Sequence, residues 1–534
     1  MCNVQSSTNL LSRFALCTLL IALVTVAANA QQYDIIIKNG KIVDGSGNSW
    51  FYGDIGVTNG KITAIGKLTG AAQRTIDATG LIVAPGFIDV HTHIEGNDLK
   101  VPTAPNFILD GVTSVVTGNC GSSNTDIARY FRRLDSIRTS INVATLIGHN
   151  DVRDAVMGES RRDPTMDEQR KMDAIVEQAM KDGAVGFSTG LIYVPGTYSK
   201  TPEVIGLAKA AAKYNGVYAS HIRDEADGMI NAVEEAINIG RQANIGVEIS
   251  HFKTTYKPNW GRSASMVDLV EKARNEGIDV TVDQYPYIAS STSLNTRLPS
   301  WTFGGGRDSL LWRLKDPTTR ARIKKAMHDD LKEKQAKDYS YALVARYVPD
   351  STINGLNISQ VNVKWGRKAT ADNEIETILK MIEAGGASMV FFSMDENDLK
   401  TIMKYPFNMI ASDAGINQFG SGVPHPRGYG TNARVLGRYV REMKIVHLED
   451  IIRRMTSLPA QKFKLTDRGL LKPGMAADIV VFDENIVSDK ATFEHPHQYS
   501  VGFKYVLVNG TVTVDDGKHN GTRAGMVLKG PAAK

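Results

Sequence analysis

Short β-branched segments alternate with amphipathic helical segments along most of this 534-residue chain. This alternation is typical of β/α units arranged around a parallel sheet. A helix is expected at 227–244, where Ile230, Val233 and Ile237 lie on one apolar face. Eight strands are predicted from short apolar runs, at 87–93, 112–120, 143–149, 185–190, 217–221, 246–251, 279–287 and 408–413. Eight β/α units predict an α/β fold with a closed (β/α)8 TIM-like barrel over residues 87–465.

The flanks of the barrel predict a second domain, because a chain of this length exceeds one ordinary domain. Residues 33–45 (YDIIIKNGKIVDG) and 505–517 (YVLVNGTVTVDDG) share alternating apolar residues around an Asn-Gly pair, and each is predicted to form a β-hairpin. Neither flank has enough apolar surface to fold alone. We therefore expect 31–86 and 466–534 to form one small β-sandwich together.

One interval of the barrel is longer than a single β/α connection. Residues 298–367 include a charged helical stretch at 316–337, and they are predicted to form an insertion near the barrel mouth. The insertion is either a lid or substrate wall, or a surface elaboration without a role.

The first 30 residues are predicted to be a signal peptide. Arg13 precedes an apolar run at 14–28, and Ala28-Asn29-Ala30 offers a cleavage site with small residues. The alternative is an uncleaved anchor, but the run is shorter than the roughly 20 residues that span a bilayer. The mature protein is therefore expected to be periplasmic or secreted, without a stable membrane anchor.

Charge and cysteine content narrow the function further. The formal net charge is +5, and the basic residues are scattered, which disfavours a nucleic-acid partner. Cleavage after residue 30 removes Cys2 and Cys17, so the mature chain keeps only Cys120. A lone thiol is commonly a buried hydrophobic residue, so its neighbours decide its role.

Most predicted strands end in a side chain that can bind a metal. His91 and His93 are two positions apart, so they face the same side of the first strand. Further candidates close other strands, namely Cys120, His221, His251 and Asp413. Barrels of this type place their active sites where the strands end. Imidazole and thiolate ligands suit Zn²⁺, although cobalt or manganese can substitute, and Asp413 can bind metal or accept a proton.

Longer motifs carry a resemblance to a known family. GFIDVHTH, Asp413 at a strand end and the flanking β-sandwich resemble the amidohydrolase superfamily. A second set resembles its D-aminoacylase (N-acyl-D-amino-acid deacylase) branch, namely VVTGNCG, GFSTGLIYVPG, YASHIRDE, EISHFK, YPYIASST and HPRGYGTNARVLGRYVRE.

The resemblance implies one tightly held zinc ion on Cys120, His221 and His251. It also implies a weaker second site near His91, His93 and Asp413, bridged by the thiolate. Related branches bridge two metals with a carboxylated lysine instead. Gly186-Phe187-Ser188-Thr189 at the fourth strand contains no lysine, which favours the cysteine arrangement.

The expected reaction is hydrolysis of an N-acyl-D-amino acid to a carboxylic acid and a D-amino acid, and the D preference rests on the resemblance alone. Metal-activated water would attack the amide, with Asp413 carrying the proton to the leaving nitrogen. Arg427 is the leading candidate for the substrate carboxylate, because a guanidinium binds carboxylates through two parallel hydrogen bonds. Lys253 lies near the same mouth, and by resemblance the pocket is completed by Tyr193, Tyr285 and Ser291.

Several alternatives stay open. The substrate is otherwise a short peptide with a C-terminal D-residue or a cyclic amide of the dihydroorotase and hydantoinase kind, and a non-catalytic exported metal- or ligand-binding protein is a further alternative. His149 is either an outer partner of the metal ligands or a polar strand cap. Four further histidines are expected in turns or on the surface, namely His425, His447, His495 and His497.

Overall fold

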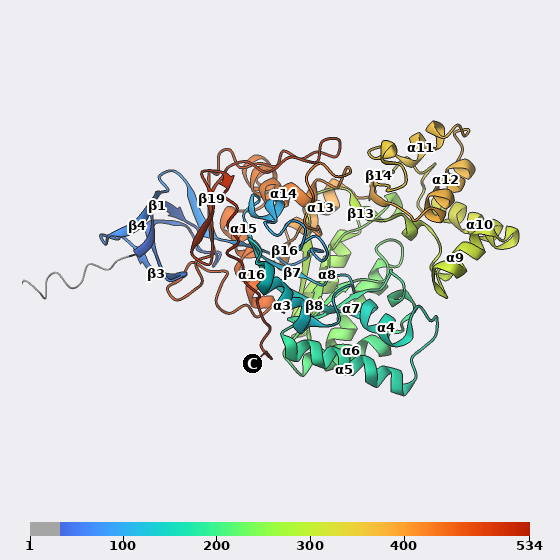
Figure 1. Ribbon diagram of the computed structural model, residues 1–534, viewed down its shortest axis with the longest axis horizontal. Helices are drawn as coiled ribbons and strands as arrows, with labels where there is room; N and C mark the ends of the chain where they lie inside the picture. The colour runs from blue at the N-terminus through green and yellow to red at the C-terminus, as the bar shows by residue number, and fades with distance from the viewer. Residues whose placement is uncertain (1–32, 534) are drawn as a thin grey trace, which may run out of the picture.

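Eight parallel strands form the central sheet of the computed structural model, which describes residues 33–533 (Figure 1). In spatial order they are β6 (Phe87–Asp89), β7 (Val112–Thr117), β8 (Asn142–Gly148), β9 (Gly186–Gly190), β10 (Val217–His221), β11 (Gly246–Ile249), β12 (Val280–Gln284) and β16 (Asn408–Ile410). A parallel bridge between Thr92 and Ala414 joins the two edge strands. The predicted barrel is therefore confirmed, and each predicted strand overlaps one observed strand.

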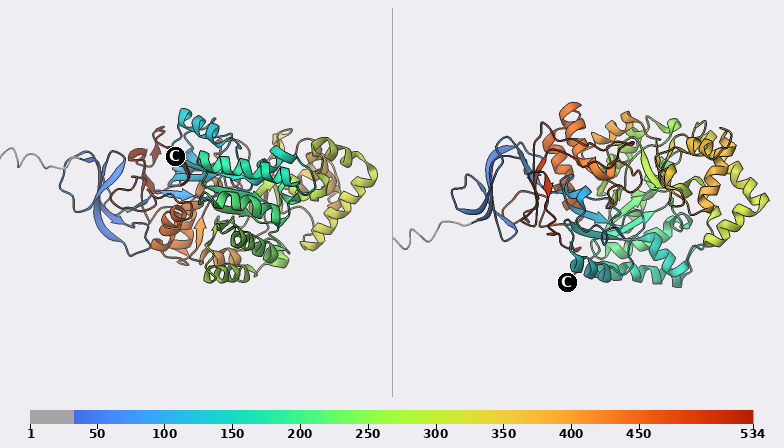
Figure 2. Two further views of the ribbon diagram at one scale, coloured as in Figure 1. Left: turned by 90° about the horizontal axis from the view of Figure 1, so that it is seen from below. Right: turned by 45° about the horizontal axis from the view of Figure 1, so that its top comes forward.

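Helices cover the outside of this sheet (Figure 2). They are α2 (Pro105–Ile108), α3 (Ile127–Ile137), α4 (His149–Met157), α5 (Met166–Asp182), α6 (Thr201–Ala212), α7 (Met229–Ala243), α8 (Ser263–Asn275), α13 (Glu396–Met403), α14 (Arg427–Arg434), α15 (Leu448–Met455) and α16 (Ser457–Lys462), with a π-helical turn η7 (Val435–Glu442) after α14. Helix α7 overlaps the helix predicted at 227–244.

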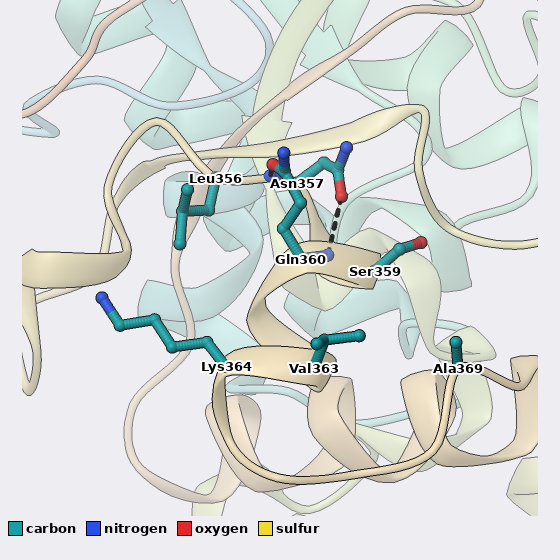
Figure 3. Close-up of a pocket in the computed structure, with 7 residues that line it drawn as sticks. All are labelled: Leu356, Asn357, Ser359, Gln360, Val363, Lys364 and Ala369. Carbon is teal, nitrogen blue, oxygen red and sulfur yellow. Dashed lines mark hydrogen bonds between the residues drawn. The ribbon is translucent and has the colours of Figure 1, made fainter.

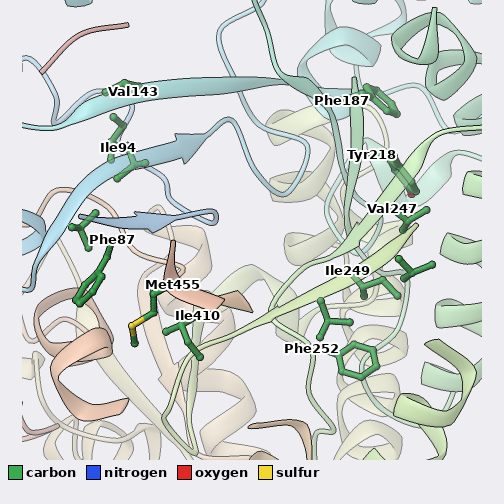
Figure 4. Packing of buried hydrophobic residues seen from close by; sticks show 14 of the residues in the cluster. Phe87, Ile94, Val143, Phe187, Tyr218, Val247, Ile249, Phe252, Ile410 and Met455 are labelled. Atoms are coloured by element: carbon green, nitrogen blue, oxygen red, sulfur yellow. The ribbon is translucent and has the colours of Figure 1, made fainter. Parts of the chain in front are cut away.

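A continuous hydrophobic core lies between the strands and the surrounding helices (Figure 4). Phe187 on β9, Tyr218 on β10 and Ile249 on β11 are fully buried there, and Met455 of α15 belongs to the same cluster. Each such side chain contributes about 1.5–3 kcal/mol by burial, so this core holds the strand ends in place.

A nine-stranded mixed sheet combines both ends of the described chain. Its strands are β1 (Tyr33–Ile42), β2 (Phe51–Thr58), β3 (Lys61–Gly66), β4 (Ala72–Asp77), β5 (Ile82–Pro85), β17 (Ile479–Phe482), β18 (Phe503–Val508), β19 (Thr511–Asp515) and β20 (Lys518–His519). The antiparallel pair β5–β17 joins the N-terminal part to the C-terminal part. The sheet folds around its own core, because β1 pairs with β4 along its first half and with β5 at its end.

The two predicted hairpins have different outcomes. Residues 505–517 form one, since β18 and β19 pair on either side of Asn509-Gly510. The hairpin predicted at 33–45 is wrong, because β1 runs without a turn through Asn39-Gly40. Asn39 adopts a φ of 60°, and the register against β2 shifts between Ile37 and Gly40, so this Asn-Gly pair makes a bulge.

A separate unit lies between β12 and β16, at the opposite end of the molecule from the nine-stranded sheet (Figure 1). It contains an antiparallel sheet with strands β13 (Ser290–Ser293), β14 (Ala342–Arg346) and β15 (Ser388–Phe391), and the helices α9 (Gly306–Lys315), α10 (Pro317–Glu333), α11 (Ile358–Lys364) and α12 (Ala371–Glu383). Twenty-one buried hydrophobic residues form its own core. The predicted insertion at 298–367 lies inside this longer unit.

Short 3₁₀ turns occur in the connections, at η2 (Gly196–Tyr198), η3 (Lys257–Asn259), η4 (Leu294–Arg297), η5 (Ser300–Thr302) and η6 (Ser351–Ile353). The predicted signal peptide at 1–30 lies outside the described residues. Within residues 33–533, no helix combines the length and the apolar character needed to cross a membrane.

Candidate metal centre

The six predicted metal ligands gather at the carboxyl end of the barrel strands. His91 and His93 follow β6, Cys120 follows β7, and the remaining three lie at or after the ends of their strands, namely His221, His251 and Asp413. Ligand atoms of His91, Cys120 and His251 all lie within 4.8 Å of one another, as do those of His91, His93 and Asp413. The structure thus brings together side chains from five strands.

Left-handed backbone conformations turn three of these side chains inward. Cys120 has a φ of 52°, His251 of 38° and Asp413 of 51°. Such values are uncommon for residues with a Cβ and are tolerated where the surroundings hold them. Gly190 on β9 makes room for the Cys120 turn, because a Cβ there would lie 2.0 Å from the Cys120 carbonyl oxygen.

The Cys120 thiol is the centre of the first group. Its Sγ lies 3.3 Å from His91 Nε2, 3.6 Å from His221 Nδ1 and 3.7 Å from His251 Nε2. Burial raises the pKa of this thiol, but the charge of His91 and hydrogen bonds from the three imidazoles outweigh it and hold the pKa well below its ordinary value. The thiolate is therefore the favoured form, which is the form that binds metals.

Asp413 is the centre of the second group. Its Oδ1 lies 3.2 Å from His93 Nε2 and 3.5 Å from His91 Nε2, and its Oδ2 lies 2.8 Å from Arg427 Nη1. Burial raises the pKa of this carboxyl, yet the charges of Arg427 and His91 hold it well below the ordinary range. Asp413 is consequently ionised at neutral pH.

Two carboxylates that were not predicted from the sequence contact the histidines on the side away from the metal-ligand cluster. Asp283 Oδ2 lies 3.1 Å from His91 Nδ1, and Asp283 Oδ1 accepts a 2.8 Å hydrogen bond from the His251 backbone N–H. Glu225 Oε1 lies 3.0 Å from His251 Nδ1. Such outer partners fix the ring orientation of metal-binding histidines. Signals for both were present, since Asp283 lies on the seventh barrel strand and Glu225 lies four residues after His221.

The two predicted cationic residues are buried and each has a carboxylate partner. Arg427 is 5% exposed, and its Nη2 also donates to the Ser291 carbonyl oxygen at 3.3 Å. Lys253 is 4% exposed, and its Nζ lies 2.5 Å from Glu225 Oε1. Both positive charges are thus held next to the metal-ligand cluster.

The three residues that were predicted to supply hydroxyl groups lie around the metal-ligand cluster. The Tyr193 ring centroid lies 4.9 Å from that of His221, and its hydroxyl lies 3.0 Å from Thr292 Oγ1 of the inserted unit. The face of Tyr285 carries the Arg427 guanidinium, 4.5 Å from the ring centroid. Ser291 contributes its backbone, because its hydroxyl donates to the Met389 carbonyl oxygen. Strand β13 of the inserted unit therefore contacts both Tyr193 and Arg427.

The remaining histidines lie outside the cluster. His149 is the first residue of α4, not a strand end, and its Nε2 lies 2.9 Å from Glu203. His425 was expected near the surface but is buried, with Nε2 donating to the Ala289 carbonyl oxygen. His447 precedes α15 and His495 is exposed, whereas His497 is partly buried and binds the Tyr429 hydroxyl at 2.7 Å.

A pocket lies away from these residues, on the inserted unit around α11 (Figure 3). One side of this pocket is the N-terminus of α11, where a capping box forms and the Asn357 side chain accepts a hydrogen bond from the Gln360 backbone N–H. It is lined by Leu356, Asn357, Ser359, Gln360, Val363, Lys364 and Ala369. It contains none of the predicted site residues.

The donor atoms at the barrel mouth fit a bound metal. A thiol with a lowered pKa and an ionised carboxylate lie among imidazole nitrogens, and His221 Nδ1 lies only 2.6 Å from His251 Nε2. Both nitrogens turn toward the same sulfur. A buried group of this composition matches the sulfur, nitrogen and oxygen ligands that divalent transition metals prefer.

Comparison with known proteins decides the family. The model of the amidohydrolase family matches residues 74–282 and 369–514. The chain belongs to the amidohydrolase family. The predicted resemblance is therefore confirmed, and the gap between the matched segments covers most of the inserted unit.

Two relatives match this amidohydrolase over nearly its whole length. It is 36% identical to an N-acyl-D-glutamate deacylase of Alcaligenes xylosoxydans xylosoxydans, over 90% of this chain and 93% of the relative. It is 34% identical to a D-aminoacylase of the same organism, over 95% of this chain and 99% of the relative.

Solved structures show the same similarity. The N-acyl-D-glutamate deacylase of Bordetella bronchiseptica, solved with zinc and a phosphonate that mimics the tetrahedral intermediate, has a TM-score of 0.80 and 36% identity, over 93% of this amidohydrolase and all of that chain. A D-aminoacylase structure has a TM-score of 0.79 and 34% identity over the same shares.

Proposed function

We propose that this amidohydrolase is a metal-dependent deacylase that hydrolyses the amide bond of N-acyl-D-amino acids. One observation carries the proposal, namely the ionised Asp413 placed between two imidazoles and a buried guanidinium, beside a thiolate. A proton carrier, metal ligands and a cation for a carboxylate thus meet in one place. The similarity to deacylases of N-acyl-D-amino acids over more than nine-tenths of the chain supports the same activity.

The donor set defines which residues would hold the metal. Cys120, His221 and His251, whose donor atoms contact one another, would form the firmer site. His91, His93 and Asp413 would form a second one, with zinc as the proposed ion. When bound there, a zinc ion supplies a Lewis acid that lowers the pKa of a water molecule and polarises a carbonyl group.

Asp413 is the proposed general base and acid. Its low pKa keeps it ionised, so it can accept a proton from the attacking water. As the tetrahedral intermediate collapses and the C–N bond breaks, the same carboxyl group delivers that proton to the leaving amine nitrogen. Arg427 stabilises the ionised form before attack and after proton delivery.

The α-carboxylate of the substrate is proposed to bind between Arg427 and Lys253. Arg427 is stacked on Tyr285, and Lys253 Nζ lies 5.8 Å from the centroid of the same ring. Both cations therefore lie next to one aromatic ring. An acylated amino acid differs from a generic amide by its free carboxylate. Two buried cations would bind that carboxylate and so favour acylated amino acids as substrates.

Export is proposed on the sequence of residues 1–30, with the mature enzyme in the periplasm or outside the cell. An Arg before a short apolar run and a small-residue cleavage site support it. Amino-terminal sequencing of the protein recovered from a cell envelope fraction tests this, and an intact N-terminus in the cytosol would contradict it.

Hydrolysis of a substrate panel tests the activity, measured as amine release from the acylated amino acids and dipeptides and as formation of the ring-opened carbamoyl acid from hydantoin. The zinc-loaded protein is incubated with N-acetyl-D-glutamate, N-acetyl-D-aspartate, N-acetyl-D-methionine, their L enantiomers, dipeptides ending in a D-residue, and hydantoin. We expect release from at least one N-acetyl-D-amino acid, loss of that release with a chelator, and recovery on adding zinc. Preferred turnover of dipeptides or hydantoin would support the alternatives, and no turnover of any compound would favour a binding protein.

A further inference from the structure

Asn106 is a buried side chain outside the metal centre, only 2% exposed, on the short helix α2. Its amide nitrogen donates to the Gly428 carbonyl oxygen at 2.7 Å and to the Gly415 carbonyl oxygen at 3.2 Å. Its amide oxygen accepts a 3.2 Å hydrogen bond from the Asn417 backbone N–H. All the hydrogen bonds of this amide therefore go to two backbone segments.

Each of these segments carries one half of the ion pair between Asp413 and Arg427. Gly415 lies two residues after Asp413, in the loop that follows β16, and Gly428 directly follows Arg427 in the first turn of α14. The two charged side chains lie 2.8 Å apart. Asn106 thus bridges the supports of both partners.

Two other side chains, Asn97 and Asp110, each hold only one of these segments. Asn97 donates to the Ile416 carbonyl oxygen at 2.8 Å, which fixes the loop after β16. Asp110, four residues after Asn106, accepts from the backbone N–H groups of Asn432 and Ala433 and fixes α14 at its second turn. The direct link from Asn417 Nδ2 to the Gly428 carbonyl oxygen is long, at 3.4 Å.

We propose that Asn106 is a positioning residue that sets the spacing between Asp413 and Arg427. The proposal rests on the proposed function, in which this pair handles the proton and the substrate carboxylate. Loss of the amide removes the side-chain partners of the Gly415 carbonyl and the Asn417 N–H and leaves the Gly428 carbonyl only the long contact from Asn417, so the two segments move apart to find new partners. A misplacement of about 1 Å at reacting groups costs up to about 100-fold in rate.

The kinetic test uses Asn106→Asp, which keeps the shape and the acceptor but loses the donor, together with Asn106→Ala. We expect each to lower kcat/KM for the best N-acetyl-D-amino acid by at least about tenfold at equal zinc content. The same change made in an Arg427→Lys background should cost less than about threefold, because the pair is already disturbed.

The matched control is Asp110→Asn, which loosens α14 without touching the loop after β16. We expect it to keep kcat/KM within about threefold of the unsubstituted enzyme. Equal losses for Asn106→Asp in both backgrounds, or activity within twofold of the unsubstituted enzyme, would overturn the proposal.

Hydrogen–deuterium exchange gives a readout that needs no activity. Asn106→Asp should speed exchange in residues 414–417 and in residues 428–430 together, whereas Asp110→Asn should speed exchange only in α14. Faster exchange in one of the two segments alone, or in neither, would overturn the bridging role. If no N-acyl-D-amino acid is hydrolysed, the proposed function fails while this measurement still decides the role of Asn106.

Discussion

At the scale of single residues, the contacts of Asp413 allow metal binding and proton transfer to be tested separately. One carboxylate oxygen faces two histidines and the other faces Arg427. Meanwhile Cys120, His221 and His251 form a group of donors that does not depend on Asp413. The firmer metal site should therefore survive changes at Asp413.

Asp413→Asn removes the group that accepts the proton but keeps its size. We expect kcat to fall by about two to four orders of magnitude, the usual contribution of a general base or acid. Zinc at the firmer site should stay, because Cys120, His221 and His251 are unchanged. Metal analysis of the dialysed variant and initial rates of amine release measure the two effects, and unchanged turnover would contradict the assigned role.

Cys120→Ala removes the sulfur that faces three imidazole nitrogens. We expect less than about a tenth of the zinc of the unsubstituted protein after dialysis, since the remaining donors are neutral imidazoles. His149→Ala is the matched control, because His149 is also fully buried but contacts Glu203 instead of the cluster. Full zinc content in Cys120→Ala, measured by atomic absorption, would refute ligation by the thiolate.

At the scale of elements, the sequence predicts the strands better than their ends. The strand predicted to reach Cys120 ends at Thr117, and the one predicted to reach His251 ends at Ile249. Apolar periodicity marks the buried part of a strand, but it carries no signal for the left-handed turn that follows. These ligands could still be predicted, because residues just after the barrel strands lie at the mouth.

Contacts that depend on tertiary packing could not be predicted from the sequence. Asn39-Gly40 has the composition of a hairpin turn, yet β1 continues because it pairs with three other strands. Glu225 belongs to the YASHIRDE motif, but only the structure places it against His251 and Lys253. Asp283 was inside a predicted strand, and its inward direction depends on the register of β12.

Gly190→Ala tests whether β9 supports the Cys120 turn. The added methyl group would lie 2.0 Å from the Cys120 carbonyl oxygen, so the turn or the strand must shift. We expect weaker zinc retention and a free energy of unfolding lower by about 1–3 kcal/mol, the usual cost of overpacking. Gly304→Ala is the control, because its new methyl group meets no atom closer than 3.8 Å. Equal zinc affinity in both variants would show that the turn does not depend on Gly190.

At the scale of the whole molecule, the catalytic barrel depends on chain segments from both sides of it. Strand β5, just before the barrel, pairs with β17 after it, and the segment around Ser500 returns to the barrel. Residues 290–391 leave the barrel and form a core of their own, yet β13 returns to Arg427 through Ser291. The C-terminal flank and the inserted unit therefore both contact residues of the barrel directly.

Asp110 links helix α14 of the barrel to the C-terminal segment around Ser500, and its ionisation should make stability depend on pH. It accepts hydrogen bonds from Ser500 Oγ and from Asn432 and Ala433 of α14. Burial raises its pKa to about 7, although these hydrogen bonds oppose the rise. An unfolded Asp has a pKa of about 3.9, so between these values the folded state binds the proton more tightly. The stabilisation by this proton is complete below about pH 4 and is lost as pH rises to about 7.

Asp110→Asn removes the titration but keeps the shape. The free-energy difference of unfolding between the unsubstituted protein and this variant should therefore shrink as pH rises from 5 to 8, by at most about 1.4 kcal/mol per pH unit. Urea denaturation of both metal-free proteins at pH 5, 6, 7 and 8 measures it, and omitting the metal removes the pH dependence of ligand binding. A difference that stays constant or grows with pH would show that Asp110 is already ionised in the folded protein at pH 5, held by the hydrogen bonds that it accepts.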